Sequence, residues 1–214
     1  FTADRIWKFY RRKSTVIYPP VELTGRSPRN TSKVSGDFHL RGGRIGERPK
    51  KDYYLCVSRL ARAKRIDLAI KACNKLGFEL WVVGTGREEK YLQSIAGKTI
   101  KFLGHLIDTE LVEVYSNCKA LIFPAEDEDF GIVPVEAMSF GKPVIALRSG
   151  GVIETVVRDK TGVFFDEPTI ESLVSVLKKF KSEKYKKSDC ITQAKKFSKE
   201  KFKREIKKFI KKKC

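Results

Sequence analysis

The chain has 214 residues, 41% of them hydrophobic, and a formal net charge of +19. This length suffices for one hydrophobic core, the hydrophobic fraction is ordinary for a globular domain, and no apolar run in the sequence approaches the ~20 residues of a membrane-spanning helix. The charge is uneven, because residues 178–214 hold 17 Lys or Arg against 4 Asp or Glu and so carry +13 of the total.

The first fifty residues contain few regular patterns. Residues 2–10 have helical periodicity with Thr2 as the N-cap, and residues 15–18 predict a short strand that the following Pro-Pro pair ends. Residues 21–50 lose this periodicity and are rich in Gly, Pro, Ser, Asn and Arg, which predicts a loop or hinge segment.

From residue 51 the pattern becomes regular. Short runs rich in Val, Ile and aromatic residues predict strands buried on both faces at residues 53–58, 79–84, 99–104, 119–124, 143–147 and 162–165. Helical patterns lie between or after them at residues 66–76, 87–96, 109–117, 133–140, 153–158 and 169–180. This alternation predicts an α/β fold, a doubly wound, Rossmann-like parallel sheet over residues 51–180, followed by a basic helical tail at residues 181–214.

The five cysteines are scattered and have no metal-ligand spacing. Cys56 and Cys118 fall in or beside apolar runs. Small buried thiols in a reducing, cytoplasmic environment are the expected state.

In such sheets, ligands bind at the carboxyl ends of the strands, and the loops there carry the unusual chemistry of this chain. Arg59 and Lys64 follow the first strand and could neutralise phosphate charge, although singly they are also ordinary surface cations of a basic protein. Gly84 and Gly86 form half of a dinucleotide fingerprint whose third glycine would fall at Glu89, which excludes NAD. The sequence has no Walker loop, so the edge predicts a cradle for a ligand with phosphates and hydroxyls.

The helix predicted from residue 133 adds an anion site to this edge. The backbone N–H groups of Gly131, Ile132 and Val133 would point at the strand ends, and Pro134 in the first turn has no N–H to lose.

Two glutamates flank that helix start. A carboxylate is the natural partner of adjacent sugar hydroxyls, so Glu128 and Glu136 suggest sugars on both sides of the phosphates. The alternatives are a solvated acidic loop for Glu128, with Glu126 as its competitor, and a helix-dipole interaction for Glu136.

These motifs resemble a known family. The stretches SRLARAKRID, VVGTG, FLG, EDFGIVPVEAMSFGKPVIA and GGVIETV, in this order, are similar to the donor-binding, C-terminal half of the retaining GT-B glycosyltransferases of glycosyltransferase family 4. The wording is closest to that of the α-mannosyltransferases that use GDP-mannose.

The resemblance implies a role for each matching residue. Arg59 and Lys64 would hold the diphosphate and, with Glu128, form the catalytic group. Glu128 would bind a hydroxyl of the transferred sugar and Glu136 the ribose diol. The backbone at His105 and Leu106 would meet the base. Donor-binding positions would further include Gly84, Phe130, Gly131, Ile132 and Val133.

The resemblance also implies partners. Residues 1–20 are similar to the end of the acceptor domain, so the missing acceptor domain and a glycan or lipid-linked acceptor are expected partners. No cofactor and no metal are expected, although Asp127 and Asp129 mimic the Asp-x-Asp metal motif of the other main glycosyltransferase fold. The rival functions are a non-catalytic sugar-nucleotide-binding module and a sugar-nucleotide epimerase of similar architecture.

The basic tail has three interpretations. Phe202, Ile206, Phe209 and Ile210 share one helical face, which predicts a terminal helix that packs back on the missing half. The lysines of the other face predict a peripheral position on an anionic membrane surface. Nucleic-acid binding ranks last, because the lysine face has no aromatic residues for base stacking.

Overall fold

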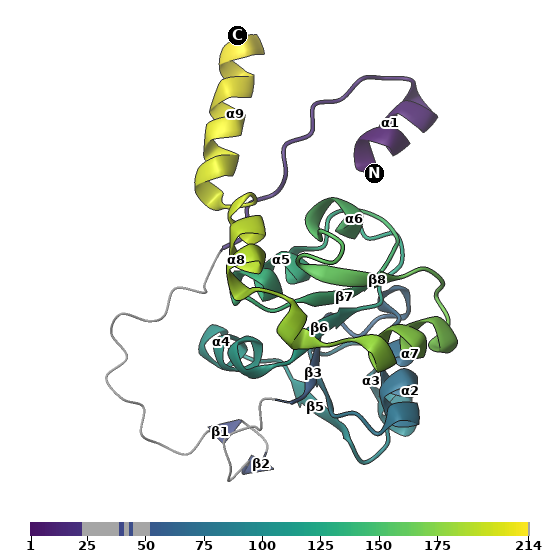
Figure 1. Cartoon of the computed structure of the whole chain (residues 1–214). Helices are drawn as coiled ribbons and strands as arrows, with labels where there is room; N and C mark the ends of the chain where they lie inside the picture. Colours follow the sequence, from purple (N-terminus) through teal and green to yellow (C-terminus); the bar gives the residue numbers. More distant parts are fainter. Residues whose placement is uncertain (23–38, 41–42, 45–51, 214) are drawn as a thin grey trace, which may run out of the picture.

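A six-stranded parallel sheet forms the centre of the computed structural model, which describes residues 1–22, 39–40, 43–44 and 52–213 (Figure 1). The strand order is β5-β4-β3-β6-β7-β8, and every neighbouring pair is parallel. The strands are β3 (Tyr54–Val57), β4 (Leu80–Val83), β5 (Ile100–Gly104), β6 (Ala120–Phe123), β7 (Val144–Leu147) and β8 (Gly162–Phe165). The predicted doubly wound, Rossmann-like sheet is confirmed, and each strand lies inside its predicted run.

The strands are apolar on both faces because both faces are covered. Leu55, Trp81 and Phe123 belong to the core on one side of the sheet, whereas the neighbouring residues Cys56 and Val82 belong to the core on the other side. Successive side chains of a strand point in opposite directions, so a continuous apolar run is what a two-sided core requires.

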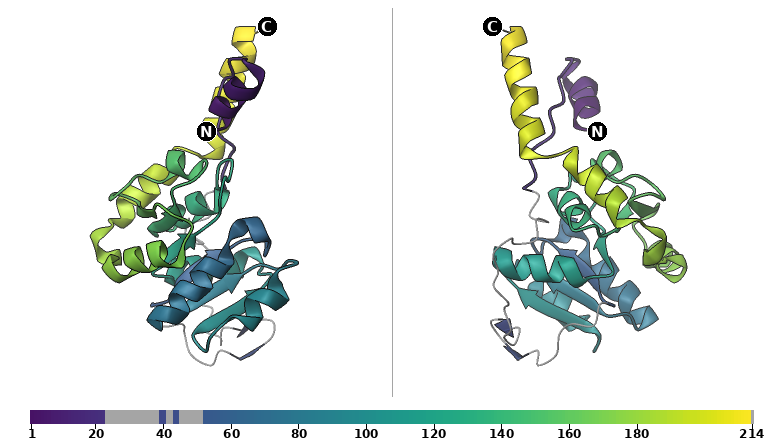
Figure 2. Two further views of the ribbon diagram at one scale, coloured as in Figure 1. Left: turned by 90° about the vertical axis from the view of Figure 1, so that its right-hand side faces the viewer. Right: turned by 60° about the vertical axis from the view of Figure 1, so that its left-hand side comes forward.

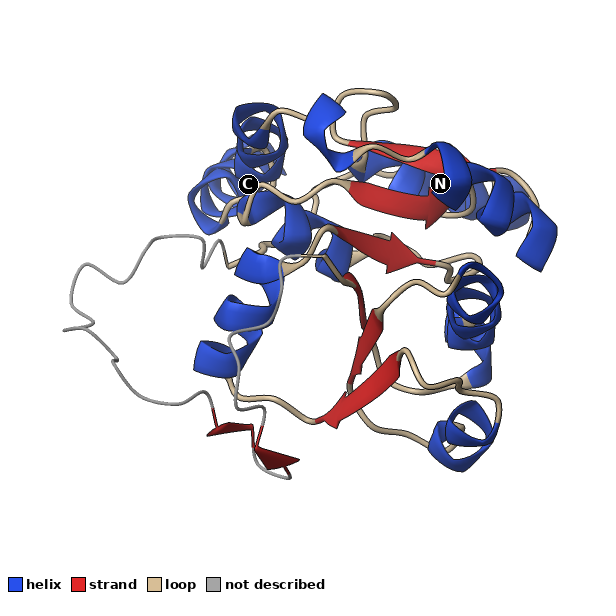
Figure 3. Cartoon of the chain, turned by 60° about the horizontal axis from the view of Figure 1, so that its bottom comes forward, coloured by secondary structure: helices blue, strands red, loops and turns tan. Residues whose placement is uncertain are grey.

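Helices form a layer on each side of the sheet (Figure 3). One core contains side chains of α2 (Ile66–Leu76), α3 (Glu89–Ser94) and α7 (Ile170–Lys179). The other contains side chains of α4 (Asp108–Asn117), α5 (Ile132–Ser139), α6 (Val152–Thr155) and α8 (Lys187–Lys195). The short turn η2 (Ser182–Lys184) joins α7 to α8. Cys190 and Ala194 of α8 are fully buried beside α5, so the packed structure continues beyond residue 180.

The two ends of the chain meet beside the sheet and then leave it. The backbone N–H of Val21 donates to the Phe197 carbonyl at 2.9 Å, and the ring of Tyr18 lies 5.3 Å from that of Phe197. From there α1 (Thr2–Tyr10) and α9 (Lys199–Lys213) extend at the same pole of the molecule, as Figure 2 shows from two sides.

Two predictions for the chain start are wrong. Residues 15–18 form no strand, because this segment packs by its side chains instead of pairing with an edge strand of the sheet. Thr2 is not the N-cap of α1, because it is already the first helical residue and Phe1 takes the cap position. The helix itself has the predicted bounds.

The remaining predictions concern the loop segment, the cysteines and membrane-spanning helices. The predicted loop at residues 21–50 lies largely outside the described residues, apart from its first two residues and the antiparallel pair β1 (His39–Leu40) and β2 (Gly43–Arg44). Within the described residues four cysteines are buried and free, which confirms the burial part of the cysteine prediction. In the same part of the chain, no helix is long and apolar enough to cross a membrane.

Candidate functional site

The strand order reverses between β3 and β6, and this reversal brings two predicted site residues together. Lys64 ends the 3₁₀ turn η1 (Arg62–Lys64) in the loop that leaves β3, and Glu128 lies in the loop that leaves β6. Their side chains form an ion pair in which they are 24% and 30% exposed. In open α/β sheets a ligand crevice is expected at such a reversal, outside the carboxyl ends of the strands.

Residues 126–129 form an acidic loop in which each side chain has its own partner. Glu126 pairs with Arg65. The backbone N–H of Asp127 donates to Ser149 Oγ at 3.0 Å, and that hydroxyl donates to Asp127 Oδ1 at 2.9 Å. Asp129 Oδ1 lies 3.5 Å from Arg5 and from the hydroxyl of Thr2 in α1. Glu126, Asp127 and Asp129 are exposed although each has a partner, whereas Glu128 is half-buried in its ion pair, so the solvated-loop interpretation does not fit the Glu128 side chain.

Two glycines after β7 fix the backbone of the acidic loop. A Cβ at Gly150 would lie 2.4 Å from the Glu128 carbonyl oxygen, and one at Gly151 would lie 2.1 Å from that of Asp129. The backbone N–H of Gly151 donates to the Glu128 carbonyl at 2.6 Å. Only glycine permits this approach, so the loop after β7 determines where the Glu128 side chain begins.

Gly84 and Gly86 make a similar close approach to the loop that leaves β3. A Cβ at Gly84 would lie 1.9 Å from the Ser58 carbonyl oxygen, and one at Gly86 would lie 2.2 Å from that of Leu60. These glycines thus allow two loops to pack closely. This packing explains why Gly84 and Gly86 resemble half of the dinucleotide-binding motif. The predicted contact of Gly84 with a donor stays a prediction.

Glu136 lies on the inner side of α5 and is half-buried. Tyr115 Oη of α4 donates to its Oε2 at 2.9 Å, and the Tyr115 ring stacks on Phe140 at 5.2 Å. Burial raises the pKa of the Glu136 carboxyl, and the hydrogen bond from Tyr115 opposes that rise in its pKa. A helix-dipole glutamate in solvent would have neither feature, so the position of Glu136 needs another explanation.

The start of α5 has the expected local geometry. Gly131 is the N-cap with a left-handed φ of 80°, which favours glycine, and Pro134 follows in the first turn. Ile132 is exposed and Val133 is half-buried.

The remaining predicted residues differ in their surroundings. Arg59 is exposed and forms no salt bridge with any described residue. His105 is exposed and Leu106 is buried. The Phe130 ring is 5.6 Å from Tyr18 and 5.3 Å from Phe197, so its side chain packs towards the chain ends. The predicted ligand contacts of these residues remain predictions.

A metal site is not evident. Within the described residues, no group of three or more His, Cys, Asp or Glu side chains could hold an ion. The two aspartates that mimic an Asp-x-Asp motif are directed to separate partners, Asp127 to Ser149 and Asp129 to α1.

Three contributors were missed from the sequence: Arg65, Ser149 and Tyr115. Arg65 could have been suspected, because two adjacent cations in one loop face two glutamates in another. No sequence signal distinguishes the hydroxyl of Tyr115 from those of the other tyrosines of the chain.

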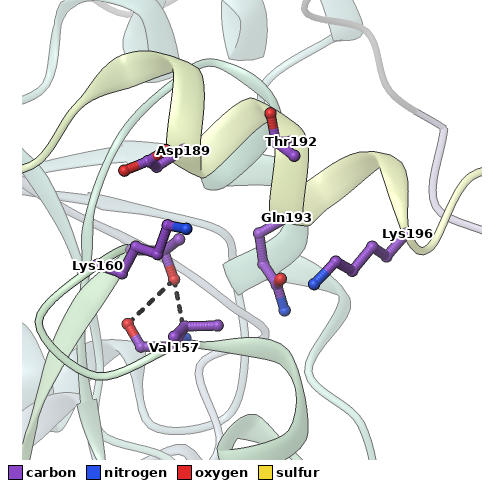
Figure 4. Close-up of a pocket in the computed structure, with 7 residues that line it drawn as sticks. Val157, Lys160, Asp189, Thr192, Gln193 and Lys196 are labelled. Atoms are coloured by element: carbon purple, nitrogen blue, oxygen red, sulfur yellow. Dashed lines mark hydrogen bonds between the residues drawn. The ribbon is translucent and has the colours of Figure 1, made fainter.

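A cavity of about 150 Å³ is lined by none of the predicted site residues (Figure 4). It is lined by Val157, Lys160, Thr161, Asp189, Thr192, Gln193 and Lys196. It lies between α8 and the loop before β8. Its polar groups bond within the chain, with Thr161 Oγ1 accepting from the Val157 N–H at 2.9 Å and Gln193 donating to the Thr155 carbonyl at 2.8 Å. The geometry at the strand reversal is the better candidate.

Comparison with known proteins places these residues in a family context. The profile described as "Glycosyl transferases group 1" matches residues 43–197. Sulfoquinovosyl transferase SQD2 of Arabidopsis thaliana is 31% identical over 135 residues, which cover 61% of this chain and 26% of the relative. Human alpha-1,3/1,6-mannosyltransferase ALG2 is 28% identical over 188 residues, which cover 77% and 43%. The chain thus spans less than half the length of these relatives.

Solved structures share the fold. A glycosyltransferase from Rickettsia africae superimposes with a TM-score of 0.80 at 19% identity, over 99% of this chain and 61% of that one. HepE of Anabaena, in a structure with UDP and glucose, gives a TM-score of 0.66 at 22% identity, over 75% of this chain and 48% of that one.

Proposed function

The chain belongs to the group 1 glycosyl transferases, and on this premise we propose that it is the donor-binding half of a retaining glycosyltransferase. Its donor is a nucleotide diphosphate sugar, and the transferred sugar is mannose. The observation that carries this proposal is the meeting of Lys64 with Glu128 at the strand reversal, because one contacts phosphate and the other sugar in the proposed complex.

The phosphates would be held by positive groups from two sides. Lys64 and the exposed Arg59 come from the loop after β3, and the first N–H groups of α5 come from the opposite loop. Preorganised cations and amides can stabilise the charge that develops on a departing nucleotide diphosphate, so transfer needs no metal. Unchanged activity of the whole enzyme after treatment with a chelator is the expected result.

The sugars would be held by the two carboxylates. Glu128 accepts from a hydroxyl of the transferred sugar. Glu136 accepts from the ribose diol through Oε1, since Tyr115 occupies Oε2. The backbone at His105 and Leu106 meets the base.

The donor identity rests on two resemblances. The wording around Glu128 and Glu136 is similar to that of GDP-mannose enzymes, and ALG2 is named as a mannosyltransferase. The HepE structure is a complex with UDP and glucose, which makes uridine the competing base. Titration of the chain with GDP, UDP and ADP, each also as its sugar-linked form, tests the choice. We expect GDP-mannose to bind most tightly. Equal affinities for the three nucleotides, or a preference for uridine, would contradict the assignment of guanine as the base but not the proposed position of the site.

The acceptor would bind to a second domain. We propose that this domain covers the pole formed by α1 and α9, where Trp7, Phe9, Tyr10 and Ile210 are at least half exposed. Exposed apolar side chains mark interaction sites where they form a contiguous patch. The acceptor is a glycan or a lipid-linked glycan at the cytoplasmic face of a membrane.

The chain alone would then bind donor and hydrolyse it only slowly, because transfer requires donor and acceptor in near-attack geometry, a positioning effect of ~7–11 kcal/mol. Incubation with labelled GDP-mannose and membrane extract, with and without a separately supplied acceptor domain, tests this. Efficient transfer by the chain alone would contradict the assignment, and product analysis with the intact enzyme separates transfer from epimerisation.

A further inference from the structure

Arg65 has a backbone conformation that arginine rarely adopts. It joins η1 to α2 with φ 50° and ψ 34°, in the left-handed region. Side chains with a Cβ are strained there, and glycine is the residue that tolerates it best. Such outliers persist only where surrounding contacts hold them, and they cluster at functional sites.

The contacts that hold Arg65 come from three parts of the chain. Its Nε donates to Asp67 Oδ1 in α2 at 3.4 Å, and its guanidinium also pairs with Glu126 of the acidic loop. A third donor lies 3.5 Å from the Pro168 carbonyl, just before α7. The Arg65 side chain is 27% exposed, and that of its partner Glu126 is 41% exposed.

Arg65 and Lys64 together form a ladder of ion pairs between two loops. Lys64 pairs with Glu128 and Arg65 pairs with Glu126, while Asp127 between them turns to Ser149 with φ 49°. A backbone hydrogen bond of 3.4 Å from Glu126 to the Ala63 carbonyl supports the same pairing of loops.

A bound ligand would affect the two ion pairs differently. Donor binding at the proposed site draws Lys64 to phosphate and Glu128 to a sugar hydroxyl, so their pair must open. The Arg65–Glu126 pair touches neither group and can stay closed. It is then the contact that keeps the two loops in register once the other has been exchanged.

We infer that Arg65 is a positioning residue, which acts through Glu126 to hold the acidic loop and the Lys64 loop at the spacing that the sugar nucleotide requires. The inference rests on the proposed function for its ligand. It concerns neither the phosphate contacts nor the sugar contacts themselves, and the left-handed backbone is explained as the conformation that brings the guanidinium to Glu126.

The test uses Arg65→Gly, Glu126→Gln and the double variant, with Arg11→Gly as the matched control. Arg11 has φ 53° and is exposed, so this control relieves the same backbone strain away from the loops. Calorimetric titration with GDP-mannose, and with UDP-glucose in parallel, should show affinity weakened on the order of tenfold for each single loop variant, as expected for coupled residues of one network. The double variant should be no weaker than the weaker single variant.

A second readout separates positioning from general damage. The affinity for the nucleoside monophosphate should be unchanged, since that ligand does not span both loops. Three results would overturn the inference. Arg65→Gly could bind the sugar nucleotide as tightly as the unchanged chain does, or the losses of affinity in the two single variants could multiply in the double variant. The third is a loss of affinity for the monophosphate equal to that for the sugar nucleotide.

A third readout needs no ligand. Hydrogen exchange at the backbone amides of Asp127 and Gly151, which are bonded to Ser149 and Glu128, should accelerate in Arg65→Gly and not in Arg11→Gly. If the unchanged chain binds neither donor, the proposed function fails, and this exchange pattern alone decides whether Arg65 holds the loop. Equal exchange in both variants would then overturn the positioning role.

Discussion

Replacing Glu128 by alanine should change the affinities for two related ligands in opposite directions. Glu128 is paired with Lys64, and both side chains are mostly enclosed. A nucleotide diphosphate must compete with Glu128 for Lys64. The carboxylate therefore opposes the binding of the free nucleotide and supports the binding of the sugar-linked form.

The magnitudes follow from the two interactions. An enclosed pair of this kind lies at the upper end of the range for surface pairs, about 1 kcal/mol, so its loss should tighten the binding of free GDP or UDP about fivefold. The sugar-linked form gains the same amount and loses a hydrogen bond to a charged group, worth ~1.5–3 kcal/mol. The net effect is a weakening by ~0.5–2 kcal/mol, roughly two- to thirtyfold.

Isothermal titration calorimetry at constant ionic strength measures both effects on one preparation. Asp129→Ala is the matched control, because it removes one negative charge from the same loop and leaves Lys64 paired. The competition between Glu128 and the diphosphate for Lys64 would be refuted by either of two results. The free diphosphate could bind Glu128→Ala more weakly than it binds the unchanged chain, or no more tightly than it binds Asp129→Ala.

Three further predictions concern the buried glutamate, a loop glycine and the tail. The pKa of Glu136 is raised above its ordinary value of 4.5 in the folded state, so the free energy of unfolding falls as the pH rises from 4.5 through the folded-state pKa. Glu136→Gln should therefore raise the melting temperature at neutral pH but not at acid pH, and it should weaken nucleotide binding. The same dependence of the melting temperature on pH in the variant and the unchanged chain would count against this prediction. Gly151→Ala should displace the acidic loop and weaken donor binding, measured by the same titration, whereas Gly77→Ala, where a Cβ meets nothing within 4 Å, should leave affinity intact. The fraction of protein that sediments with anionic vesicles should fall with added salt, and it should also fall when five lysines of α9 are replaced by Gln, namely Lys207, Lys208, Lys211, Lys212 and Lys213. Replacement of the five lysines within residues 71–101 by Gln is the control. Equal losses of vesicle binding in the two variants would refute the role of α9.

The sheet was predictable because its signal is local. Each strand is a short apolar run between helical patterns, and both signals repeat over a few residues without reference to distant partners. The same locality explains the failure at residues 15–18. Their β-branched and aromatic composition favours a strand, but strand formation needs an edge to pair with, and Tyr18 instead packs between Phe130 and Phe197.

The edge that carries the candidate site was predictable for a different reason. Once the strands are parallel, their carboxyl ends share one edge, and chain order alone assigns the loops to it. The pairing within that edge was not predictable. Lys64 and Glu128 are 64 residues apart in sequence, and whether Glu126 or Glu128 meets Lys64 depends on the approach of two loops that glycines and a left-handed aspartate adjust.

The four consecutive acidic residues of the loop can now be understood one by one. The long side chains, Glu126 and Glu128, reach the adjacent cations of the loop after β3, and the short ones, Asp127 and Asp129, take partners in the loop after β7 and in α1. Asp127 adopts a left-handed conformation, which aspartate tolerates better than most residues, and this turn sends neighbouring side chains to different elements. An acidic run would be expected to repel itself, but each charge here lies beside a separate partner. Three of these contacts can persist when a donor binds, and only the contact of Glu128 with Lys64 has to be exchanged for the ligand. The loop therefore combines three contacts that need not change with one contact, at Glu128, that we propose the sugar replaces.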